Sequence, residues 1–165
     1  MLGTERLLIN QSINQGRSKA MAESNLGVYR EDITTANDGI TIVQAVTDLP
    51  GGRTLEVAAY RESLAAYAAA HAEAGLAEAV YAGTPIGRTE AGEYQPFPLG
   101  ADGVFTAPTD AQPVGVARST VRLSDPRVGI VTSGTVNWAA VPFKVGKEAR
   151  AVLPRLDFIH VAKGQ

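Results

Sequence analysis

Alternating apolar and polar positions predict extended structure over most of the second half of the chain. The longest such stretch, DPRVGIVTSGTVNWAAVPF at 125–143, is strongly apolar and contains the only tryptophan. Ser133 and Gly134 interrupt the apolar pattern there, and two small residues in a strand are typical of either a hairpin turn or a β-bulge. Shorter extended stretches with strand-forming residues are predicted at 78–89, 103–106, 113–117 and 119–123.

One segment of the first half has helical periodicity instead. Thr54 is a suitable N-cap and Gly75 a suitable residue to end a helix, so we expect a helix at about 55–74. Aromatic and apolar residues recur through it at spacings of three and four, which places them on one helical face. They are Val57, Tyr60, Leu64, Tyr67 and His71.

The order of these elements predicts an α+β fold. A strand at 40–46 precedes the long helix, and strand–helix–strand units do not recur, so a parallel doubly wound sheet is not expected. We expect a small β-sandwich or barrel-like core of short strands, with one long helix in the N-terminal half and one short C-terminal helix. The single domain is expected at 37–165, with a β-rich region at about 78–143 and a C-terminal helix and strand at 146–163.

Residues 1–36 are polar and predict a flexible, extended N-terminal arm. Their apolar anchors are few, namely Leu7, Leu8, Ile9 and Ile13. Such a stretch buries too little surface to offset its own ordering entropy. Two interpretations stay open: a frayed terminus, or an arm that becomes ordered on a partner by adding Leu7–Ile9 as a short strand.

Composition and charge exclude several classes of function. The chain of 165 residues has 15 Lys and Arg against 17 Asp and Glu, a net charge of −2, which is not typical of proteins that bind nucleic acid or anionic membranes. It has no cysteine, which excludes disulfides and thiolate chemistry and fits synthesis in a reducing cytoplasm. Neither a signal peptide nor a membrane-spanning segment is predicted.

Candidate chemistry is sparse, so we expect no enzyme activity, no cofactor and no metal site. The two histidines, His71 and His160, lack companion ligands at metal-binding spacing. Neither a serine nucleophile motif nor a phosphate-binding glycine loop is present. A small hydrolase on a β scaffold remains an alternative, and it would require Glu78, Glu90 or His71 to gather in one pocket.

Trp138 is predicted to share one side of its strand with Val136. An aromatic residue at such a position is usually part of the core. It is also a frequent anchor of subunit interfaces, because tryptophan contributes a large contact area. Both interpretations stay open.

The second half of the chain, 82–165, resembles the lambda-type head decoration proteins of tailed bacteriophages. Three stretches carry the resemblance in order: AGTPIGRTEAGEYQPF, DGVFTAPTDAQPVGVA and DPRVGIVTSGTVNWAAVPF. They are rich in glycine, proline and valine, and a short helix and an apolar last strand follow them as in the family. The long alanine-rich helix departs from the family pattern, in which a short arm leads almost directly into the β region.

The resemblance implies a virion structural protein that binds the outer surface of the capsid as a homotrimer and stabilises it against the pressure of packed DNA. Its partners would be itself and the major capsid protein. The arm residues Leu7, Leu8, Ile9 and Ile13 would then contact the shell. The subunit interface would use Trp138, Val136, Tyr60 and Tyr67. A different virion subunit, of a tail tube or connector, is the main alternative.

Overall fold

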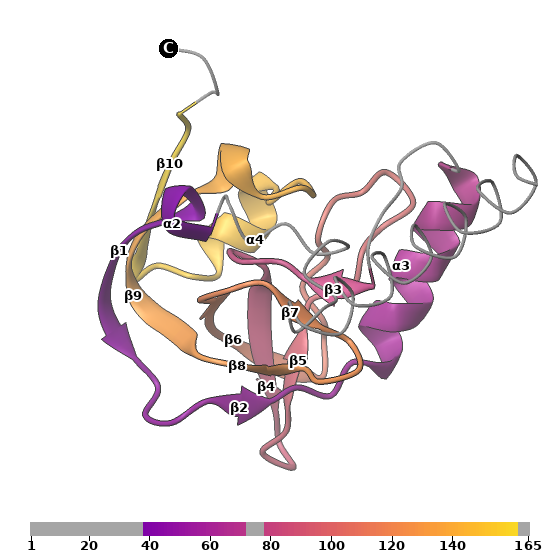
Figure 1. Cartoon of the computed structure of the whole chain (residues 1–165), viewed down its shortest axis with the longest axis horizontal. Helices are drawn as coiled ribbons and strands as arrows, with labels where there is room; N and C mark the ends of the chain where they lie inside the picture. Colours follow the sequence, from indigo (N-terminus) through magenta and orange to yellow (C-terminus); the bar gives the residue numbers. More distant parts are fainter. Residues whose placement is uncertain (1–37, 72–77, 162–165) are drawn as a thin grey trace, which may run out of the picture. The chain divides into compact units, whose positions relative to one another are not determined.

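The computed structural model describes residues 38–71 and 78–161, which belong to one compact unit. Their regular secondary structure is mostly β-strand, arranged in a largely antiparallel sheet with helices beside it (Figure 1). The α+β prediction is therefore confirmed at the level of fold class.

The main sheet is built from six strands that are distant in sequence. They are β1 (Ile42–Asp48), β4 (Pro85–Thr89), β5 (Tyr94–Pro96), β6 (Ala111–Ala117), β9 (Ile130–Asn137) and β10 (Leu156–Ile159). Their order is β1-β9-β6-β4-β5, and β10 also pairs with β9. Two short antiparallel ladders complete the β structure, β2 (Arg53–Thr54) with β8 (Arg127–Val128) and β3 (Ala79–Val80) with β7 (Val121–Arg122).

Strand β9 is the centre of this arrangement. Along one side it pairs antiparallel with β1, and its other side is shared by β6, at Ile130 and Val131, and by β10, over 134–137. The β9–β10 pair is the parallel one. Ser133 and Gly134 lie inside β9 and both pair with β1, so the chain does not form a hairpin there. The extra residue of β9 in this irregular register is the neighbouring Thr132, not Ser133 or Gly134.

The long helix, α3 (Ala58–Ala70), begins later than predicted. Thr54 is not its N-cap, because it pairs with Arg127 in the β2–β8 ladder, and Val57 occupies the cap position. The backbone N–H of Leu55 donates to the Pro126 carbonyl, which keeps this segment out of the helix. The predicted end at Gly75 lies outside the described residues.

Three shorter helical segments correct the other predicted boundaries. They are α2 (Asp38–Thr41), η2 (Trp138–Ala140) and α4 (Lys147–Ala151). Helix α2 takes up the first part of the predicted 40–46 strand. Helix α4 is shorter than the predicted C-terminal helix because the chain turns between it and β10, where the Leu156 N–H donates to the Leu153 carbonyl.

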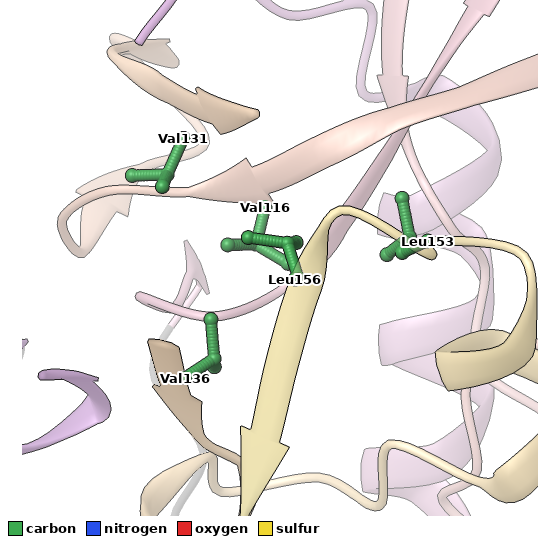
Figure 2. Packing of buried hydrophobic residues seen from close by; sticks show 5 residues of the cluster. All are labelled: Val116, Val131, Val136, Leu153 and Leu156. Carbon is green, nitrogen blue, oxygen red and sulfur yellow. The ribbon is translucent and has the colours of Figure 1, made fainter. Parts of the chain in front are cut away.

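A hydrophobic cluster joins β6 and β9 to the segment that runs from α4 into β10. Figure 2 shows its members, which are all buried: Val116, Val131, Val136, Leu153 and Leu156. Ile42 and Phe158 pack against it from β1 and β10. The apolar stretch predicted as the longest strand thus supplies the middle of the core.

Candidate interaction surfaces

Two of the four residues predicted to form a subunit interface belong to the interior of the chain. Val136 is 0% exposed and Tyr60 is 1% exposed. Val136 packs in the cluster of Figure 2. Tyr60 is on the buried face of α3. Their side chains present no surface to another molecule, so their predicted interface role is corrected to a role in the core.

Tyr60 also makes a buried polar contact. Its hydroxyl donates a hydrogen bond to the Ala79 carbonyl oxygen at 2.9 Å, which links α3 to β3. Burial raises the pKa of this hydroxyl well above its usual range, and nearby Tyr81 raises it further. Tyr60 is therefore a neutral hydrogen-bond donor that fixes the helix on the β structure.

Tyr67 is half-buried, because residues of its own chain cover much of its ring. It stacks on His71, with ring centroids 4.1 Å apart, and meets the edge of Phe143 at 5.6 Å. Phe143 in turn contacts the rings of Tyr81 and Phe105. This aromatic group holds the C-terminal half of α3 against the rest of the chain and gives His71 a packing role.

Trp138 is half-buried and lies in η2, not in a strand as predicted. The Arg150 guanidinium lies over its ring at 4.6 Å from the centroid, and the His160 ring is also 4.6 Å away. Next to it, the buried Asn137 side chain bonds both the N–H and the carbonyl of Val161. Trp138 thus joins η2 to α4 and to the chain end after β10, with part of its ring still open to solvent.

The titratable residues raised by the hydrolase alternative are not assembled into a metal cluster. Within 38–71 and 78–161, no group of three or more His, Asp or Glu side chains lies close enough to hold a metal ion. Glu90 and Asp110 line one surface hollow together with Arg88, and all three are exposed.

Among the described residues, exposed large hydrophobic side chains concentrate in β1 and in helix α2 just before it. Five consecutive residues of this strand, 43–47, are exposed. Ile40 is 48% exposed, Val43 53% and Val46 64%. No charged residue occurs from 39 to 47. We call Ile40, Val43 and Val46 the β1 patch.

An apolar groove of about 430 Å³ begins just after β1. It lies where β6 and β10 separate along β9, and hydrophobic cluster residues Leu153 and Leu156 form part of its wall. The other residues that line it are Leu49, Pro113, Val114, Thr132, Val152, Pro154 and Arg155. The groove and the β1 patch are thus two apolar surface features of this sheet.

The arm residues Leu7, Leu8, Ile9 and Ile13 lie outside the described residues. The β1 patch was missed by the sequence analysis, which treated 40–46 as an ordinary strand. A signal was present, because no charge occurs between Asp38 and Asp48, and a strand without charges is unprotected if it lies at a sheet edge. The sequence did not reveal that this strand is at the edge.

Comparison with known proteins finds no match: none for protein-family models, none among curated proteins and none among solved structures. As for membrane insertion, none of the helices in 38–71 and 78–161 has both the length and the apolar character needed to span a bilayer.

Proposed function

We propose that this protein is a capsid decoration protein of a tailed bacteriophage, which coats the outside of the shell as a trimer and stabilises it. The observation that carries the proposal is the exposed, uncharged β1 patch on a β-rich domain. Exposed apolar surface is a common mark of protein-binding sites, and Ile40, Val43 and Val46 are candidates for one. The order of the glycine- and valine-rich stretches in 82–165 resembles that of head decoration proteins, and this resemblance favours a phage capsid as the partner.

Capsid decoration requires a surface that binds other proteins, and it requires no catalytic site. A protein that binds the assembled shell better than its free subunits stabilises the assembled state by mass action. Three linked copies bind more tightly than one, because after the first contact the others form at high effective concentration. An apolar surface and a rigid β domain suit this task.

The finer parts of the proposal follow the resemblance. The β core is of the sandwich or barrel-like type, and residues 1–36 form the flexible arm that becomes ordered on the shell through Leu7, Leu8, Ile9 and Ile13. The protein is made in the host cytoplasm and ends on the outer capsid surface, with itself and the major capsid protein as partners and without enzyme activity.

Removing residues 1–35 is expected to leave the domain folded and to weaken shell binding by more than about tenfold. The physical reason is that each leucine or isoleucine fully buried at an interface contributes roughly 1.5–3 kcal/mol. The measurement is co-sedimentation of the full-length and shortened proteins with expanded shells of the same virus. Circular dichroism of both proteins shows whether the domain stays folded.

A matched control replaces Asn10, Gln11 and Ser12 with alanine, which changes polar arm residues and keeps the apolar ones. This variant is expected to bind shells like the full-length protein. Undiminished binding by the shortened protein would refute the role of the arm. Rings or tubes formed by the isolated protein in electron micrographs would instead favour a tail-tube or connector subunit.

A further inference from the structure

The two most exposed valines of β1 occupy special positions in its pairing with β9. Ile42 pairs with Val136, Gln44 with Thr135, Ala45 with Gly134 and Thr47 with Ser133. Val43 and Val46 have no partner in this register, because each is the extra residue at a shift of the ladder. Such β-bulges change the direction in which a side chain points. Both valines are exposed to solvent, as are the paired residues 44, 45 and 47 of the same strand.

The irregular pairing is fixed by particular residues of β9. Gly134 has a φ of 145°, and a Cβ atom at this position would lie 2.0 Å from the Gln44 carbonyl oxygen. Only glycine therefore allows β1 to approach β9 between the two bulges. Beside it, the Thr132 hydroxyl donates to the Thr47 carbonyl at 3.0 Å and also contacts the Thr47 hydroxyl. The bulged form of β1 is therefore determined by residues of β9.

The β1 patch lacks the charges that usually protect an edge strand. Edge strands commonly carry lysine or proline, and bulges that interrupt the ladder also discourage pairing with a foreign strand. In β1 the bulges are present, but they display valine instead of charge. A partner at this surface would therefore bind through apolar side chains more than through a continued backbone ladder.

We propose that the β1 patch is the surface through which copies of this chain contact one another. A patch placed on a symmetry axis meets copies of itself, so it must tolerate its own charges. The patch has none, and the Asp48–Arg118 ion pair at the end of β1 supplies one charge of each sign. Copies of the patch can therefore meet around the threefold axis of a trimer without like-charge repulsion.

This assignment names the surface between the subunits, and that the subunits form a trimer rests on the proposed function. The test is the oligomeric state of the full chain in solution, measured by analytical ultracentrifugation over a range of concentrations. The wild type is expected to associate. The double variant Val43→Lys/Val46→Lys is expected to associate at least about a hundredfold more weakly, because association would bury two charges on every copy.

A matched control is Ala65→Lys/Ala69→Lys, which introduces the same two charges at exposed positions of α3. It is expected to associate like the wild type. If the lysine variant fails to fold, Val43→Thr/Val46→Thr replaces it, since threonine keeps the valine shape and suits a strand. This variant is expected to lose association by a smaller factor.

Three results would overturn the assignment: unchanged association of the Val43/Val46 variants, an equal loss in the control, or a wild type that stays monomeric. Shell co-sedimentation of the same proteins separates the two proposals. Association through the patch without shell binding would refute capsid decoration alone. A monomeric wild type whose shell binding is lost in the Val43/Val46 variants would show that the patch contacts the shell instead.

Discussion

Replacing Gly115 with alanine is expected to lower the free energy of unfolding by about 3 kcal/mol, the upper part of the usual range for overpacked interiors. Gly115 lies in β6, and a Cβ atom there would be 2.1 Å from the Val131 carbonyl oxygen of β9. It would also lie 3.0 Å from Cγ2 of Ile130. The first contact is with backbone, so a change of rotamer cannot relieve it, and β6 must separate from β9.

The measurement is urea unfolding followed by circular dichroism, with the wild type and Gly129→Ala in parallel. Gly129 lies between β8 and β9, and the nearest atoms to a Cβ there are side-chain carbons of Arg118 at 3.5 and 3.6 Å, an ordinary contact distance. We expect the Gly129 variant to unfold near the wild-type midpoint. If both variants unfold together, close approach of β6 and β9 at Gly115 is not what stabilises this part of the sheet.

The β-rich character of the second half could be predicted because local alternation is a direct consequence of strand geometry. The stretch 125–143 contains β9, and its apolar residues Val131 and Val136 occupy the core. The pairing of β9 with three different strands could not be predicted, because partner choice depends on residues up to about a hundred positions away. The same limit explains the start of α3, where pairing of Thr54 with Arg127 overrides its capping preference.

The candidate interface residues show a second limit of sequence patterns. Periodicity identifies the face of α3 that contains Tyr60 and Tyr67, but not whether the same chain or another molecule covers that face. The structure covers Tyr60 completely and Tyr67 in part, using residues of the same chain. The β1 patch was missed for the opposite reason. Its two bulges depend on Gly134 of a distant strand, and this is invisible in the local pattern of 40–46.

The two apolar features of the sheet therefore have different physical roles. The residues of β9 are buried and stabilise one chain, whereas Val43 and Val46 of β1 stay in water when the chain is alone. A valine that is more than half exposed contributes less to the stability of the single chain than a buried one. Substitutions in β9 should change folding, and substitutions in the β1 patch should change association with little effect on folding. Unfolding measurements on β9 variants and association measurements on β1-patch variants therefore test independent properties.

Replacing Tyr60 with alanine is expected to cost about 3–5 kcal/mol of stability, as is typical when a buried aromatic ring is removed. Tyr60→Phe keeps the ring and loses only the hydrogen bond to Ala79, so it is expected to cost about 1 kcal/mol. Urea unfolding at pH 7 measures both differences. Equal losses in the two variants would mean that the hydroxyl, not the ring, holds α3 in place.

Alkaline pH provides an independent test of the burial of Tyr60. Because burial raises the pKa of its hydroxyl, the folded chain keeps this proton at a pH where the unfolded chain releases it. The unfolded state then binds fewer protons, so stability falls as the pH rises above about 10, the ordinary pKa of tyrosine. Tyr60→Phe lacks the group and is expected to lose less stability than the wild type between pH 9 and roughly pH 11. Parallel decline of the two proteins over this interval would show that the Tyr60 hydroxyl is accessible to water in the folded chain.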